Sequence, residues 1–177
     1  MIEIKTTRLV LRHIEPTYKQ SLIDLLGDES VASMMSNVPF PYKETDADWW
    51  IGAVKTKPYA LNIFSKDELI GGVALTEQDT KIFELGYWIG KLYWGNGYAT
   101  EACLGILKYI RNIETDAQVF AKVYPNNMVS KKILVKLGFI EDGTDVSIDI
   151  SSKEQILCER YALKLSQLHL FKTLEQN

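Results

Sequence analysis

Hydrophobic and polar residues alternate along several short runs of the chain, which is the pattern of strands with one buried face. The runs are residues 8–14, 59–77, 81–90, 118–124, 146–150 and 155–165. The run 59–77 reads as two strands joined by a tight turn at Lys66-Asp67-Glu68. The last two runs read as an antiparallel pair, so the pattern predicts a mainly antiparallel sheet of six or seven strands.

Between these runs, hydrophobic residues recur every three to four positions, as on the buried face of an amphipathic helix. The predicted helices cover residues 15–28, 29–36, 45–54, 99–112 and 127–139. Thr45 is expected to cap the third helix, and Gly138 to close the last one. The elements predict a single α+β domain over residues 1–177, with residues 166–177 forming a short helix or a frayed tail.

Composition and charge narrow the classes of function. The chain has 177 residues, 46% hydrophobic and 24% charged, with a net charge of −3, which does not favour nucleic-acid binding. Cys103 and Cys158 lack metal-like spacing and suit a reducing, cytoplasmic setting. Neither a signal peptide nor a membrane span is expected. We therefore expect no metal, membrane or nucleic-acid partner, and either a monomer or a homodimer.

The segment YWGNGYATEA, residues 93–102, places two glycines directly before a predicted helix. A dinucleotide-binding loop would need a third glycine where Thr100 stands, and a P-loop would need Gly-Lys-Ser/Thr, which the chain lacks. A third use of such a loop remains. The amides from Gly95 to Ala99 can bind a pyrophosphate at the positive end of the helix.

Two stretches carry a resemblance to a known family. ELGYWIGKLYWGNGYATEA, residues 84–102, resembles the acetyl-CoA-binding core of the GNAT N-acetyltransferases, most closely the branch that acetylates N-termini of ribosomal proteins. The family's Gln/Arg-x-x-Gly-x-Gly/Ala loop aligns with residues 94–99, with Trp94 in place of Gln or Arg. VYPNNMVSKKILVKLGFIEDG, residues 123–143, resembles the Asn-x-x-Ser…Lys-x-Gly-Phe motif, and TTRLVLRHIEP resembles the family's opening strand.

The resemblance implies a sheet with two splayed central strands, 82–89 and 118–124, and acetyl-CoA as the co-substrate between them. It implies backbone contacts to the pantetheine arm and amide contacts to the pyrophosphate. The implied binding residues are Tyr87, Trp88, Ile89, Gly95, Asn96, Gly97, Tyr98, Ala99, Thr100, Asn127 and Ser130.

In this family the amine attacks the thioester directly, so a base and a proton donor are needed rather than a nucleophile. An α-amino group, with a pKa of about 7.7, loses its proton at pH 7 at a cost of about 1 kcal/mol, against about 4.6 kcal/mol for a lysine-like amine. Glu84 is the first candidate base, with Glu77 and Asp79 as alternatives acting through a water molecule. Many relatives carry a tyrosine acid where Leu134 stands, so Ser130 is the candidate donor to the leaving sulfur.

The acceptor remains open between an N-terminal amine of a peptide or protein and a small amine such as a polyamine, an amino acid or an antibiotic. Residues that can line its pocket are Met34, Met35, Phe40, Tyr42, Trp49 and Trp50. Lys131 and Lys132 can face phosphates, whereas His13, His169 and Cys103 read as structural or solvated. Two other readings are an acyl-CoA-binding module without turnover and a purely structural interaction domain.

Overall fold

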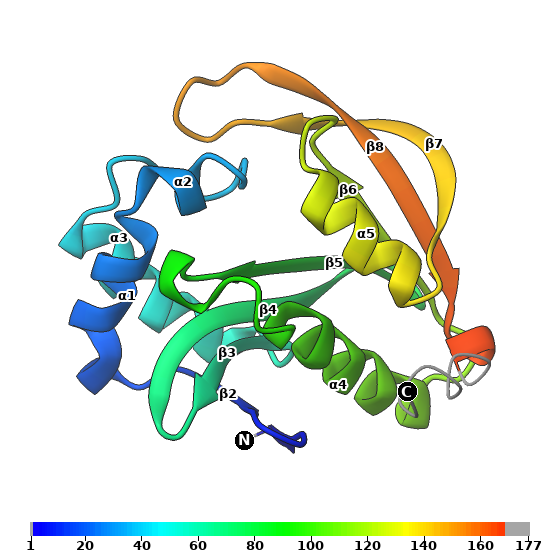
Figure 1. Ribbon diagram of the computed structural model, residues 1–177, viewed down its shortest axis with the longest axis horizontal. Helices are drawn as coiled ribbons and strands as arrows, with labels where there is room; N and C mark the ends of the chain where they lie inside the picture. Colours follow the sequence, from blue (N-terminus) through cyan, green and yellow to red (C-terminus); the bar gives the residue numbers. More distant parts are fainter. Residues whose placement is uncertain (1, 169–177) are drawn as a thin grey trace.

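The hydrophobic runs form one sheet of eight strands in the computed structural model, which describes residues 2–168 (Figure 1). The strand order is β1-β2-β3-β4-β5-β6-β8-β7, and every neighbouring pair is antiparallel except β5 and β6. The strands are β1 (Glu3–Lys5), β2 (Val10–Arg12), β3 (Ala60–Ser65), β4 (Glu68–Asp79), β5 (Ile82–Ile89), β6 (Gln118–Val123), β7 (Ile140–Ile148) and β8 (Gln155–Lys164).

Helices cover both faces of this sheet (Figure 1). The α-helices are α1 (Lys19–Leu26), α2 (Glu29–Ala32), α3 (Glu44–Ala53), α4 (Tyr98–Ile113) and α5 (Met128–Lys136), and short 3-10 helices span Pro16–Tyr18, Val54–Thr56 and Lys91–Tyr93. One buried cluster joins α4 and the start of the chain to one face of the sheet, and a second joins α1, α2 and α3 to the opposite face. Burial of the apolar stripes on these helices is the main stabilising term.

The parallel pair at the centre of the sheet is paired over only three residues. Ile82, Phe83 and Glu84 lie opposite Gln118, Val119 and Phe120, and no pairing follows on that side. Strand β5 continues to Ile89 along β4, whereas β6 continues to Val123 along β8. The two strands therefore splay apart beyond Glu84, as the family resemblance implied.

Several local predictions need correction. The sheet has eight strands rather than six or seven, because β1 is a three-residue strand too short for an alternating pattern to reveal. Thr45 does not cap α3. The helix begins at Glu44, its N-cap is Lys43, and the Lys43 backbone N–H donates to the Asp46 carboxylate at 2.8 Å. The last strand, β8, lies inside the sheet between β6 and β7, and β7 forms the edge.

The end of α5 follows the predicted chemistry. Gly138 has a φ of +92°, a left-handed conformation that glycine adopts without steric cost. The Phe139 N–H donates to the Leu134 carbonyl at 3.0 Å and the Gly138 N–H to the Val135 carbonyl at 3.0 Å, which is a Schellman motif. At the chain end, Leu165 and Leu168 are buried. The rest of the predicted tail lies outside the described residues.

Candidate active site

The glycine loop joins the end of β5 to the start of α4, and no side chain among residues 2–168 caps the N-terminus of α4. Gly95 and Gly97 have φ values of +78° and +76°, and Gly97 directly precedes the helix. A left-handed φ at both positions explains why glycine is needed there. The Trp94 indole donates to the Ile89 carbonyl at 2.6 Å, and the Asn96 amide donates to the carbonyls of Tyr93 and Trp94 at 3.1 Å. Gly95, Asn96 and Gly97 themselves are exposed.

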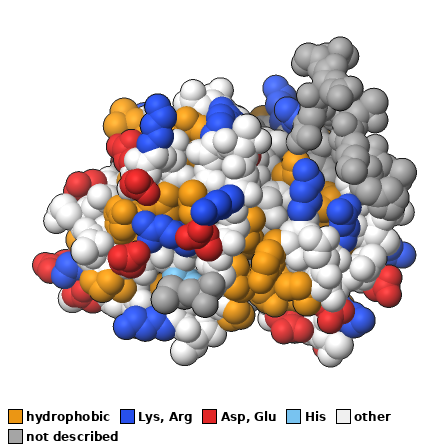
Figure 2. Space-filling view, turned by 90° about the horizontal axis from the view of Figure 1, so that it is seen from below, with side chains coloured by type: hydrophobic (Ala, Val, Ile, Leu, Met, Phe, Trp, Pro, Cys, Tyr) orange, Lys and Arg blue, Asp and Glu red, His pale blue; other side chains and the backbone are white. Residues whose placement is uncertain are grey.

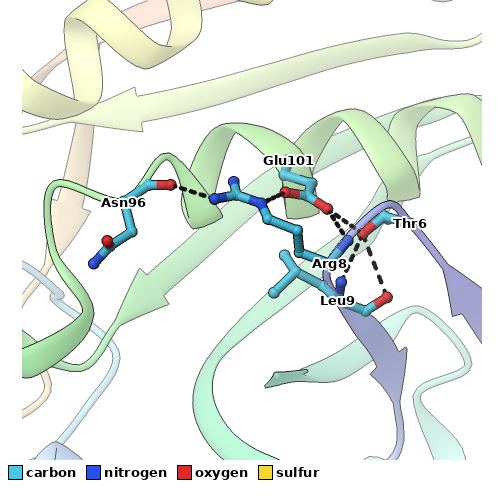
Figure 3. Close-up of polar contacts among 5 residues, drawn as sticks. All are labelled: Thr6, Arg8, Leu9, Asn96 and Glu101. Carbon is cyan, nitrogen blue, oxygen red and sulfur yellow. Dashed lines mark hydrogen bonds and ion pairs between the residues drawn. The ribbon is translucent and has the colours of Figure 1, made fainter. Parts of the chain in front are cut away.

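A network from the start of the chain holds this loop from behind (Figure 3). The Arg8 guanidinium donates to the Asn96 carbonyl at 2.9 Å and to the Glu101 carboxylate at 2.7 Å. Glu101 also accepts from the Arg8 backbone N–H and from the Thr6 hydroxyl, both at 2.7 Å. Burial alone would raise the pKa of Glu101, but the hydrogen bonds from Thr6 and Arg8 and the Arg8 charge outweigh it and lower that pKa. The network fixes the loop to the first turn of α4.

The backbone of β5 presents a free edge beyond the splay. The Gly90 N–H, just after β5, donates to the Ile70 carbonyl in β4. On the other side of β5, the N–H of Gln118, the first residue of β6, donates to the Lys81 carbonyl. Because successive backbone groups of a strand point to opposite sides, the N–H groups of Tyr87 and Ile89 face away from β4 into the splay. Trp88 faces β4 instead. Its predicted backbone contact to a ligand at the free edge does not fit this geometry, and only its indole is available.

A cleft of about 910 Å³ opens beside this edge, between the α2–α3 segment, strands β3 to β5 and strands β6 and β7. Glu84 and Ser130, the two predicted catalytic residues, both line it, as do Tyr87, Trp88 and Asn127. The Glu84 carboxylate lies 3.5 Å from the Lys122 ammonium, and both side chains are partly exposed. The structure thus brings the candidate base and the candidate proton donor to one cavity.

On the other side of the splay, Asn127 and Ser130 form the start of α5. The Asn127 side chain accepts from the Ser130 N–H at 3.0 Å and caps the helix. The Tyr87 hydroxyl donates to the Ser130 carbonyl at 3.4 Å, and burial raises the pKa of Tyr87, so this hydroxyl stays protonated. Leu134 is fully buried in the core. The position at which relatives carry a tyrosine acid is therefore apolar.

The remaining candidates separate into cleft and non-cleft residues. Five of the six predicted acceptor-pocket residues line the cleft, and they are Met34, Met35, Tyr42, Trp49 and Trp50. Phe40 is exposed but does not line it. Glu77 and Asp79, the alternative bases, are exposed and lie outside the lining.

Four further predictions concern residues away from the chemistry. The Lys131 ammonium donates to the Pro125 carbonyl and to Glu159, both at 2.6 Å, so it is engaged away from the phosphate loop. His13 lies 3.1 Å from the Lys57 carbonyl, and His169 falls outside the described residues. Cys103 is a buried free thiol whose pKa is raised by burial, consistent with core packing.

The surface and the ligand-binding groups of the site have several further features. On the face shown in Figure 2, basic and acidic side chains are interspersed among hydrophobic ones. Within residues 2–168, no cluster of His, Cys, Asp or Glu has the arrangement of a metal site. None of the helices in the same range is both long and apolar enough to span a bilayer. The exposed loop amides suit a pyrophosphate, and the free β5 edge suits the amides of a pantetheine arm.

Two features of the site escaped the sequence analysis. The sequence places Arg8 only within the opening strand. Its contact with the loop could not be predicted, because the two segments meet only in the folded protein. Asn62 is buried on β3 and lines the cleft. A polar residue inside the otherwise apolar run ALNIF was the available signal for it.

Comparison with known proteins decides the family. Residues 8–140 match the model of the acetyltransferase (GNAT) domain, which covers most of the chain. The chain belongs to the GNAT family. The uncharacterized N-acetyltransferase p20 of Bacillus licheniformis is 28% identical over 151 residues, covering 81% of this chain and 85% of that protein. This GNAT protein is therefore an acetyl-CoA-dependent N-acetyltransferase, as its sequence predicts.

Solved structures show the same fold at lower identity. One is RimL, a ribosomal-protein alpha-N acetyltransferase in complex with coenzyme A, with a TM-score of 0.77, 15% identity and coverage of 93% of this chain and 99% of that chain. Another is the microcin self-immunity acetyltransferase MccE in complex with acetyl-CoA and AMP, with a TM-score of 0.75, 19% identity and coverage of 89% and 93%. Both show that proteins whose structures hold coenzyme A or acetyl-CoA share the fold seen here.

Proposed function

We propose that this GNAT enzyme transfers the acetyl group of acetyl-CoA to the N-terminal amine of a peptide or protein, by direct attack in a ternary complex. The observation that carries the proposal is the coincidence of three features in one place. The free edge of β5 at Tyr87, the candidate base Glu84 and the candidate donor Ser130 all line the same cleft.

In this proposal the donor side binds acetyl-CoA through backbone groups. The amides of residues 95–100 hold the pyrophosphate, helped by the positive end of α4. The N–H groups of Tyr87 and Ile89 bind the pantetheine arm as an added strand would. Asn127 orders the first turn of α5 beside it. One N–H at the free edge also polarises the thioester carbonyl and stabilises the oxyanion.

The chemistry assigns one task to each of two side chains. Glu84 takes a proton from the amine, directly or through water, so that the neutral nitrogen attacks the acetyl carbonyl carbon. The C–S bond breaks as the amide C–N bond forms, and Ser130 donates a hydrogen bond to the leaving sulfur. A carboxylate is a sufficient base for an α-amine, because an α-amine with a pKa of about 7.7 is partly neutral at pH 7.

A small amine is the second candidate for the acceptor. The microcin C7 self-immunity acetyltransferase MccE, whose complex holds acetyl-CoA and AMP, shares this fold. The tryptophans and methionines that line the cleft fit an apolar small amine as well as an apolar peptide side chain. The similarity to RimL favours the peptide reading.

The setting that we propose for this reaction is the cytoplasm. Cys103 and Cys158 are buried free thiols, which a reducing compartment preserves. We propose that the protein is a monomer or a homodimer and that residues 1–177 form one domain.

Initial rates of CoA release with a panel of acceptors test the proposal. The panel contains peptides with free N-termini, a polyamine and free amino acids. It also contains the same peptides with a blocked N-terminus and a lysine side chain as their free amine. We expect turnover of the free N-termini at least about tenfold faster than of the others, with intersecting double-reciprocal plots. Saturable acetyl-CoA binding without CoA release for any acceptor would identify a binding module instead.

A further inference from the structure

Asn62 is a buried polar residue of the cleft lining with an acceptor atom that no group among residues 2–168 uses. The residue is 2% exposed and lies on β3. Its side-chain nitrogen donates to the Gly71 carbonyl at 3.4 Å, and its side-chain oxygen has no hydrogen-bond partner among residues 2–168. Buried polar atoms are nearly always paired, so an unpaired one beside a cavity indicates a missing partner.

The orientation of this amide follows from its neighbour. The Gly71 carbonyl can only accept a hydrogen bond, so the NH₂ group of Asn62 must face it. The opposite assignment would place two acceptor oxygens against each other. The side-chain oxygen of Asn62 is therefore the atom left for a donor that enters the cleft.

The strand register shows where this oxygen lies relative to the reaction. Asn62 is opposite Gly72, and Gly72 is opposite Trp88, so the three form one row across β3, β4 and β5. A Cβ on Gly72 would lie 2.5 Å from the indole nitrogen of Trp88, so the indole extends over this glycine. The row brings an acceptor oxygen and an indole N–H donor to the same end of the cleft.

The floor between this row and Glu84 is made of small residues. Ala74 and Gly86 are opposite each other in the adjoining row, and a Cβ on Gly86 would meet nothing within 4 Å. All of these positions belong to the cleft lining. An extended chain can therefore lie over the floor from the β5 edge to Asn62.

We propose that Asn62 is a specificity-determining residue for the acceptor and that its side-chain oxygen accepts the N–H of a peptide amide in that acceptor. The Trp88 indole donates to the carbonyl oxygen of the same stretch of peptide. This inference rests on the proposed function and deepens it, because it defines the acceptor as an extended peptide. Asn62 lies two strands, about 9.5 Å, from β5, a span of about three extended residues.

Peptide amides of one to five residues with free N-termini provide the test, compared in the wild type, Asn62→Leu and the matched control Asn112→Leu. Asn112 is exposed near the end of α4. For the wild type and the control, we expect kcat/KM to rise by about tenfold when the peptide reaches three or four residues. The Asn62→Leu enzyme should lose this rise and keep the kcat/KM of the one-residue acceptor and the Kd of acetyl-CoA within about twofold.

Two further readouts separate recognition from a structural role. In a series of peptides, each methylated at a single amide nitrogen, one peptide should be a poor acceptor for the wild type. The Asn62→Leu enzyme should acetylate that peptide as well as it acetylates the unmethylated parent. The free Asn62→Leu protein should also have a higher Tm, because it no longer buries an unpaired oxygen. A lower Tm with an equal loss for acceptors of every length would overturn the inference, as would a length profile unaffected by the substitution.

The same data distinguish failure of this inference from failure of the proposed function. Turnover of amines with no dependence on peptide length would overturn the role of Asn62 and leave acetyl transfer intact. Absence of turnover by the wild type with every acceptor, despite acetyl-CoA binding, would overturn the proposed function itself.

Discussion

At the scale of single residues, Glu84 carries the most specific chemical prediction. Replacing it by Gln keeps the shape of the side chain and removes the base, so kcat/KM for an N-terminal amine should fall by about 100-fold at pH 7. The loss should shrink above pH 8.5, because the amine, with a pKa of about 7.7, is then already neutral. Initial rates of CoA release over pH 6.5–9.5 measure this.

The matched control for that substitution is Glu77→Gln, on the neighbouring strand and outside the cleft lining. It should retain the wild-type rate within about twofold. An equal loss in the two variants, or a loss in Glu84→Gln that does not change with pH, would remove Glu84 from the role of base.

Ser130 provides a smaller residue-scale prediction. Its backbone N–H is capped by Asn127 and its carbonyl accepts from Tyr87, so Ser130→Ala preserves the local fold and removes only the hydroxyl. We expect kcat to fall by about fivefold, the size of one lost hydrogen bond to the leaving sulfur, with the Kd of acetyl-CoA unchanged. An unchanged kcat in single-turnover experiments would show that the hydroxyl does not contact the sulfur.

At the scale of elements, the fold depends on the contact between the opening segment and α4. Glu101 has a lowered pKa because hydrogen bonds from Thr6 and Arg8 and the Arg8 charge outweigh its burial. Its contribution to stability is therefore complete above its ordinary pKa of 4.5 and is lost as the pH falls through the lower folded-state pKa. Glu101→Gln should lower the free energy of unfolding by about 1–2 kcal/mol at pH 7 and flatten its decline below pH 4.5.

Urea unfolding between pH 3 and pH 7 measures that difference. Glu15→Gln is the control, because Glu15 is 62% exposed in its pair with Arg12 and a surface pair contributes little. If Glu101→Gln and Glu15→Gln show the same pH profile, the network does not couple the opening segment to the loop helix.

The sequence predicts elements of this kind unevenly. The helix α4 and the end of α5 at Gly138 are specified locally, by a long apolar stripe and by a glycine that must adopt a positive φ. Strand β1 escaped prediction because three residues cannot display a period of two. Thr45 is not the cap of α3 because the helix begins one residue earlier, at Glu44, where the Lys43 N–H donates to the Asp46 carboxylate. Both misses reflect local geometry: β1 is defined by its pairing with the next strand, β2, and the start of α3 by the hydrogen bond from Lys43 to Asp46.

At the scale of the whole molecule, the site depends on how the strands separate. Glu84 and the glycine loop could be selected from the sequence, since one lies on an amphipathic strand and the other precedes a helix. Neither Arg8, which contacts the loop, nor Asn62, which lines the cleft, could be selected in this way, because the role of each depends on contacts between distant parts of the chain. The backbone direction of Trp88 likewise depends on the β4 register, which no local pattern encodes.

The central claim is that acetyl-CoA binds at the glycine loop and the splayed β5 edge. Calorimetric titration of acetyl-CoA into the wild type, Gly97→Trp and Gly143→Trp tests it most directly. Both glycines have positive φ values, +76° and +90°, but only Gly97 precedes α4 at the loop. We expect saturable binding by the wild type and Gly143→Trp, and at least about a 100-fold weaker Kd for Gly97→Trp. Equal binding by all three folded proteins would contradict the account.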